Sequence, residues 1–139
     1  MTISTSVKTK AIKFIYELDR ELNIHNKNNK ETLTFFKATL HAMRDKLNNR
    51  DAMLLLSGLP PYLKPIFWEG WKPSQSCMST ESFIELVRKY SVVYGSGYIK
   101  EKEIKESVKK VFEMIENKLT PENKLKVKTS LPDEIRKCI

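Results

Sequence analysis

Apolar side chains recur every three or four positions over most of this chain, which is the spacing of one face of an α-helix. Four long stretches show the pattern, over residues 7–22, 30–47, 80–94 and 100–118. They predict four long helices whose inward side chains are Ala11, Phe14, Ile15, Leu18 and Leu22; Leu33, Phe36, Leu40, Met43 and Leu47; Phe83, Leu86, Val87, Tyr90 and Tyr94; and Ile104, Val108, Val111, Phe112 and Ile115.

Capping residues and prolines predict four further, shorter helices. Asn48 and Thr120 are typical N-caps, and Pro121 suits the first position of a helix. The two helices that follow these caps are expected over residues 49–57 and 121–129, and each ends at a Leu-Pro pair because the residue before proline avoids the α region. Proline then opens two more, over residues 60–68 and 132–139. We expect Ser79 or Thr80 to cap the third long helix.

The last 32 residues repeat an earlier stretch of the chain. Residues 36–67 fall on residues 108–139 when they are moved forward by 72 positions, and Pro60 then coincides with Pro132. A repeat of this length predicts a duplicated structural unit. Its apolar pairs are Phe36 with Val108, Leu40 with Phe112, Met43 with Ile115, Leu47 with Leu119, Met53 with Leu125, Leu55 with Val127, Leu59 with Leu131, Leu63 with Ile135, Ile66 with Cys138 and Phe67 with Ile139.

The predicted fold is therefore all-α: a single compact domain over residues 1–139, made of two tandem repeats. Each repeat has about four helices, two long and two short. Repeat one covers about 7–68, a connector about 69–79, and repeat two about 80–139. Residues 91–99 could form a β-hairpin by composition, but the helical periodicity that precedes them favours a helix and a loop.

Composition places the chain among ordinary globular proteins. At 139 residues it can bury a sufficient core without metal or disulfide. Cys77 and Cys138 form no metal-ligand pattern, and we expect reduced thiols and no metal or cofactor.

The N-terminus lacks the apolar core of a signal peptide, and no aliphatic run could span a membrane, so we expect a cytoplasmic protein without a membrane partner.

The net charge of +8 is distributed rather than concentrated. Residues 1–72 carry 12 basic and 7 acidic side chains, and the remainder carries 13 and 10. A basic balance can attract nucleic acid through phosphate contacts, but no Arg-rich or aromatic-basic stripe is present. A solvated basic surface is the simpler interpretation.

Polar or aromatic side chains that occur in only one of the two repeats are not required for the fold that the repeats share. We therefore take them as the candidate site residues. These are His41, Arg44, Asp45, Trp68, Glu69 and Trp71. One hypothesis is an anion site formed by His41 and Arg44 against a tryptophan wall. The other is an inter-repeat clamp, in which Arg44 or His41 hydrogen-bonds Asp45, Glu69 or a backbone carbonyl and holds the connector while Trp71 fills the core. No catalytic motif is present, and no catalytic residue is proposed.

These residues also carry a resemblance. The string from Leu40 to Leu47, LHAMRDKL, followed by Leu59-Pro60, the Glu69-Gly70-Trp71 connector and a closing Leu131-Pro132 unit, resembles a bacterial domain-of-unknown-function family, number 2267. The resemblance covers nearly all of the chain; Met43 and Lys46 differ from the usual leucine and arginine. It implies a small all-helical protein and brings no established activity.

Three functions are compatible with these observations. The leading hypothesis is a non-enzymatic protein-binding or adaptor module that uses the surface near Trp68 and Trp71. The alternative is weak, sequence-tolerant nucleic-acid binding through the basic surface. The least favoured is an enzyme acting on a small anion near His41 and Arg44. The sequence names no partner and fixes no oligomeric state.

Overall fold

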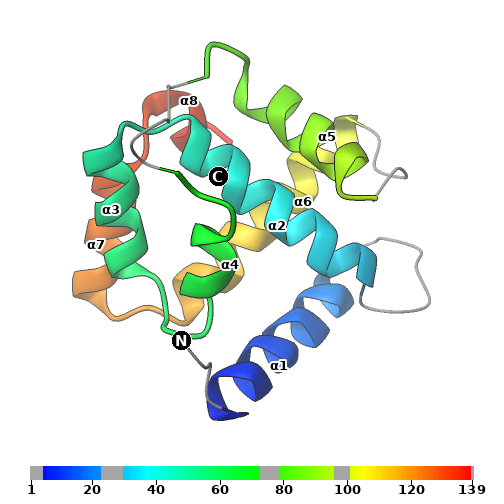
Figure 1. The fold of residues 1–139 in the computed structure, drawn as a ribbon, viewed down its shortest axis with the longest axis vertical. Helices are drawn as coiled ribbons and strands as arrows, with labels where there is room; N and C mark the ends of the chain where they lie inside the picture. The colour runs from blue at the N-terminus through cyan, green and yellow to red at the C-terminus, as the bar shows by residue number, and fades with distance from the viewer. Residues whose placement is uncertain (1–4, 23–29, 73–78, 96–100, 139) are drawn as a thin grey trace.

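The computed structural model describes residues 5–22, 30–72, 79–95 and 101–138 (Figure 1). Eight helices and no strand occur in these ranges, which confirms the all-α prediction. In chain order they are α1 (Thr5–Glu21), α2 (Lys30–Asp45), α3 (Asn49–Gly58), α4 (Lys64–Trp68), α5 (Phe83–Val93), α6 (Glu101–Asn117), α7 (Pro121–Ser130) and α8 (Asp133–Arg136).

The helices pack across the two halves of the chain as well as within them. α2 packs most extensively on α5, α3 packs on α7, and α6 contacts both α5 and α1. Figure 1 shows α3 beside α7, with α2 crossing the centre of the molecule between α1 and α5. The helices of both halves therefore enclose one apolar core. Its largest fully buried side chains include Phe14, Phe36, Phe67, Phe83, Leu40, Leu86 and Ile104.

The predicted caps of the short helices are present, and the cap of α5 differs. Asn48 accepts a hydrogen bond from Asp51 N at 2.8 Å, and Thr120 accepts one from Asn123 N at 3.2 Å. The predicted caps of α5, Ser79 or Thr80, are wrong. Ser82 caps this helix, accepting from Glu85 N, so the helix begins three residues later than expected.

Two short helices are shorter than expected. α4 begins at Lys64 rather than at residue 60, and α8 ends at Arg136 rather than at residue 139. Before α4 the chain makes a single turn, in which Leu63 N donates to Pro60 O. Because Pro60 precedes Pro61, it is held out of the α region, so the helix cannot begin at residue 60.

Several hydrogen bonds recur at positions 72 residues apart. Leu59 N donates to Leu56 O as Leu131 N does to Lys128 O, and Leu63 N donates to Pro60 O as Ile135 N does to Pro132 O. The duplication itself stays a prediction from the sequence. One of its apolar pairs, Met53 with Leu125, does not belong to the core, because both side chains are exposed on α3 and α7.

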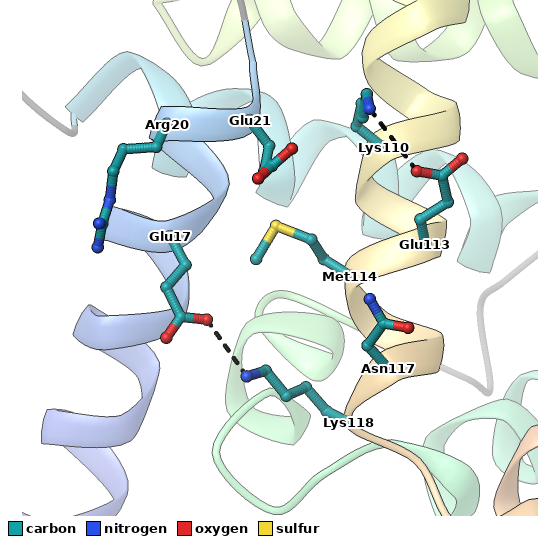
Figure 2. A pocket seen from close by; sticks show the side chains of 8 residues that line it. All are labelled: Glu17, Arg20, Glu21, Lys110, Glu113, Met114, Asn117 and Lys118. Carbon is teal, nitrogen blue, oxygen red and sulfur yellow. Dashed lines mark ion pairs between the residues drawn. The ribbon is translucent and has the colours of Figure 1, made fainter.

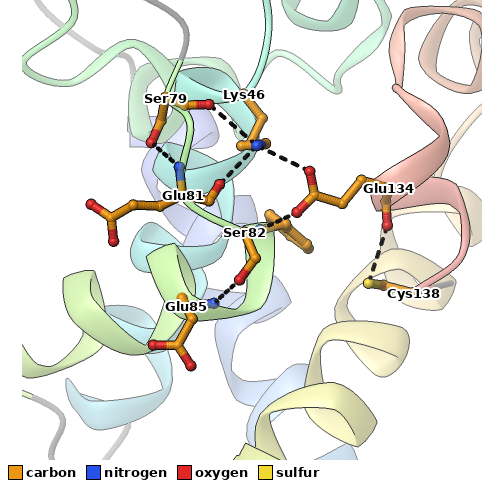
Figure 3. A network of polar contacts seen from close by, with 8 residues as sticks. Lys46, Ser79, Glu81, Ser82, Glu85, Glu134 and Cys138 are labelled. Carbon is orange, nitrogen blue, oxygen red and sulfur yellow. Dashed lines mark hydrogen bonds and ion pairs between the residues drawn. The ribbon is translucent and has the colours of Figure 1, made fainter.

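A network around Lys46 joins the end of α2 to the segment before α5 and to α8 (Figure 3). Lys46 Nζ donates to Glu81 O at 2.7 Å and to Ser79 O at 3.2 Å, and it lies 3.0 Å from Glu134 Oε2. The other Glu134 oxygen accepts from Phe83 N. Partial burial would raise the pKa of Glu134, but these two donors outweigh it, so the pKa lies below its ordinary value. The network fixes α8 to the rest of the fold.

No helix of the described ranges has the length and apolar content needed to cross a bilayer. In the same ranges, no group of three or more histidine, cysteine, aspartate or glutamate side chains is arranged to hold a metal ion. Cys138 is a free thiol, and its Sγ lies 3.4 Å from Glu134 O; Cys77 lies outside the described residues.

Candidate binding site

Arg44 and His41, on successive turns of α2, bind the carbonyl groups at the end of α4. Arg44 Nη1 donates to Phe67 O at 2.8 Å and to Glu69 O at 2.9 Å, while His41 Nε2 donates to Ile66 O at 2.8 Å. The last carbonyls of a helix have no partner within the helix, and a cation there is favoured by the helix dipole. The two side chains are only 8% and 4% exposed, so they act as buried caps of α4.

Asp45 and two tyrosines of α5 complete this polar cluster. Tyr90 donates its hydroxyl hydrogen bond to Asp45 Oδ2, and the Tyr94 hydroxyl bonds His41 Nδ1 at 2.8 Å. Arg44 Nε lies 3.5 Å from Asp45 Oδ1. Burial raises the pKa of both Tyr90 and Tyr94, and the hydrogen bond to the Asp45 carboxylate raises that of Tyr90 further. Both tyrosines therefore remain neutral donors at neutral pH.

This arrangement couples α2, α4 and α5. The clamp hypothesis expects Arg44 and His41 to bond main-chain carbonyls. His41 bonds Ile66 O and Arg44 bonds Phe67 O, both in α4, and Arg44 also bonds Glu69 O at the start of the connector. Neither of the two hollows described below is lined by them. The clamp stays a hypothesis that the variants proposed below will test.

The protonation of His41 predicts a pH-dependent stability. Burial lowers its pKa from 6.5; the bond to Ile66 O and the carboxylates of Glu69 and Asp45 oppose this shift, and the Arg44 charge reinforces it. A lowered pKa means that the unfolded chain binds the proton more readily, so this contribution to stability is complete above about pH 6.5 and is lost as the pH falls. We therefore expect the free energy of unfolding, measured by urea denaturation, to decrease between pH 7.5 and pH 5.5. The decrease should be larger in the natural protein than in His41→Gln. Equal falls in both proteins would contradict this.

Trp68, the last residue of α4, and Trp71, in the connector, lie in different environments. Trp71 is half-buried and makes a T-shaped contact with Phe67 at a ring-centroid distance of 6.2 Å, whereas Trp68 is 45% exposed. Between them Gly70 has a φ of +71°, a conformation that glycine adopts without strain and that turns the chain. The carboxylate of Glu69 pairs with Lys37 at 3.1 Å. The six predicted residues are thus divided between a buried cluster and an exposed edge.

Trp68 lines a mostly apolar groove between α1, α2 and α4, with a volume of about 830 Å³. Its apolar lining includes Ile12, Ile15, Tyr16, Leu33, Ile66 and Trp68. Lys8, Lys30, Lys37 and Glu69 supply its charged side chains. Ile12 and Tyr16 are 56% and 52% exposed, so the apolar surface is open to a partner. We call this feature the Trp68 groove.

The contribution of α1 to this groove was not predicted. Ile12 and Tyr16 lie beside the inward stripe of α1, and their separation of four residues places them on one helix face. That second apolar pair is the signal in the sequence that could have indicated an additional surface. Which elements face it is a matter of tertiary packing, and no local pattern reveals that.

A second hollow, with a volume of about 480 Å³, lies between α1 and α6, and its lining side chains are drawn in Figure 2. Three acidic and three basic side chains line it, together with Met114 and Asn117. Lys118 pairs with Glu17 at 3.2 Å, and Lys110 lies 3.9 Å from Glu113. Its charges largely compensate one another, and none of the predicted site residues lies in it. The Trp68 groove is therefore the stronger candidate.

Comparison with known proteins identifies a family and no activity. A family model described as "Uncharacterized conserved protein (DUF2267)" matches residues 13–138. A search of curated proteins gives no match. Because the match spans nearly the whole chain and agrees with the all-helical fold, this protein belongs to the DUF2267 family of uncharacterized conserved proteins.

Proposed function

We propose that this protein is a non-enzymatic binding module that holds a protein partner in the Trp68 groove. The observation that carries the proposal is the exposure of Ile12, Tyr16 and Trp68 around one apolar groove on an otherwise strongly charged chain. Contiguous exposed apolar surface of this kind marks interaction sites on proteins. Tryptophan and tyrosine are also the residues that most often dominate binding energy at interfaces.

The polar cluster supports binding rather than catalysis. An enzyme acting on a small anion would need donors of Arg44 and His41 directed at the substrate. In this structure Arg44 Nη1 and His41 Nε2 donate to backbone carbonyls instead. By holding the end of α4, these side chains fix the backbone on which Trp68 is carried, which gives the groove a preformed wall.

Replacing Trp68 with alanine should weaken partner recovery strongly. Loss of an aromatic anchor at an interface costs about 2 kcal/mol or more, which corresponds to about 30-fold in affinity. The measurement is a quantitative pull-down from a lysate of the source cells with immobilised protein. Because Trp68 is nearly half exposed, the melting temperature should change by no more than about 3 °C.

Leu125→Ala is the matched control. Leu125 is an exposed apolar residue on α7 and does not line the groove. The proposal requires that recovery falls with Trp68→Ala and Tyr16→Ser and is unchanged with Leu125→Ala. Equal recovery with all variants would contradict it. Capture of nucleic acid that disappears between 0.05 and 0.5 M salt, with no dependence on Trp68, would favour the alternative of binding through the basic surface.

A further inference from the structure

We infer that the segment bound in the Trp68 groove is an amphipathic α-helix with carboxylates beside its apolar face. This inference rests on the proposed function and adds the conformation and the charge of the partner. It follows from three features of the groove: the spacing of the residues that line its helical walls, the lack of main-chain partners for a strand, and the sign of its charged side chains.

The walls of the groove are helical faces of the right length for a helix to lie along. On α1 the lining runs from Lys8 to Tyr16, which is about 12 Å at 1.5 Å per residue. On α2 it includes Lys30, Leu33 and Lys37, which are separated by three and four residues. A groove between helices receives the apolar face of another helix through anchors spaced by three and four residues.

An extended peptide would be a poorer occupant. A strand leaves its backbone N–H and C=O groups to be satisfied by the partner, as at the edge of a sheet. The described ranges contain no strand, and the groove is lined mainly by aliphatic and aromatic side chains. A helix satisfies its own backbone groups and can therefore enter such a groove without leaving buried donors unpaired.

The charges of the groove select an acidic partner. Three lysines, Lys8, Lys30 and Lys37, line it against the single carboxylate of Glu69. That carboxylate lies 3.1 Å from Lys37 Nζ, so these two charges compensate each other, and the excess positive charge of the lining comes from Lys8 and Lys30. The net positive rim favours glutamate or aspartate on the partner, and the overall charge of +8 adds long-range attraction.

Two synthetic helical peptides test this inference directly. Both have 18 residues with leucines at i, i+3, i+4, i+7 and i+11; one has glutamates beside the leucine face, and the other has lysines. Their dissociation constants are measured by fluorescence anisotropy with the full chain. In 0.05 M NaCl the glutamate peptide should bind at least about tenfold more tightly than the lysine peptide. In 0.5 M NaCl, where exposed charges are screened, the ratio should fall below about threefold.

Charge-reversal variants test whether the preference for the glutamate peptide comes from the lysines of the groove. The double variant Lys8→Glu, Lys30→Glu should abolish the preference for the glutamate peptide. Both positions lie close to the start of a helix, where an acidic residue is tolerated well. Lys128→Glu, on α7 outside the groove, removes the same kind of charge and should leave the preference unchanged.

The outcomes separate this inference from the proposed function. If both peptides bind equally, or neither binds, the inference is wrong, while a pull-down that still depends on Trp68 leaves the proposed function standing. If Trp68→Ala changes neither peptide binding nor the pull-down, the proposed function fails as well. If light scattering shows a dimer of this chain that Trp68→Ala dissociates, the occupant is a second copy, and the inference is overturned.

Discussion

Replacing Arg44 with methionine should lower the free energy of unfolding by about 3 kcal/mol. The guanidinium donates to Phe67 O and Glu69 O from a site that is only 8% exposed. Hydrogen bonds to a charged group contribute about 1.5–3 kcal/mol each, and their removal leaves carbonyls at the end of α4 without partners. Methionine keeps most of the apolar stem, so the loss reports on the polar contacts. Urea denaturation followed by circular dichroism provides the measurement.

Two further variants distinguish the clamp from a general effect of charge. Arg44→Lys keeps the charge but has one donor group, so it should recover only part of the loss. Lys37→Met removes a partly exposed ion pair with Glu69 and should change stability by less than about 1 kcal/mol. If Arg44→Met is as mild as Lys37→Met, the clamp hypothesis is wrong and Arg44 has no structural role.

The helices could be predicted from the sequence because their signals are local. Periodicity places Phe36, Leu40 and Met43 on one face of a helix, and all three are buried in the structure. The caps at Asn48 and Thr120 act within three residues of themselves, so their geometry follows from their own segment. Errors occur where two local signals compete, as at Pro60 and Pro61 before α4.

The partners of the candidate site residues could not be predicted in the same way. His41 and Tyr94 are 53 positions apart, and Asp45 and Tyr90 are 45 apart. A periodic pattern indicates which face of a helix is apolar, but it does not indicate which other helix lies opposite. The division of roles between Trp68 and Trp71 has the same origin, because it depends on how α4 sits against α1 and α2.

The hydrogen-bond acceptors of Arg44 and His41 could not be identified from the sequence for another reason. They are main-chain oxygens of Ile66, Phe67 and Glu69, and every residue carries such an oxygen. The side chain of Glu69, which looks like a partner for Arg44 in the sequence, pairs with Lys37 instead. Telling a clamp from an anion site therefore needs the direction in which the donors point, which the sequence does not give, and the Arg44 variants above test the clamp.

Alanine at Phe36 or at Phe112 should destabilise the protein by about 3–5 kcal/mol each, the usual cost of removing a buried phenylalanine ring. Phe36, on α2, is fully buried and lies 5.2 Å from the ring of Phe14; Phe112, on α6, is 2% exposed. Because α2 packs on α5 and α6 packs on α1, each ring belongs to a core that both halves share. Each variant should therefore unfold in urea as a single transition with the m-value of the natural protein.

The alternative is that the two halves are separate folding units, in which case one variant would melt only its own half. Such behaviour would appear as two transitions, or as a protease-resistant fragment that contains the other half. Ile104→Val, a milder change at a fully buried site in α6, should cost about 1 kcal/mol and keeps the comparison interpretable if an alanine variant does not fold. One cooperative transition in all three variants is the result that a single shared core requires, because packing between the halves transmits the loss of any one buried side chain to the whole fold.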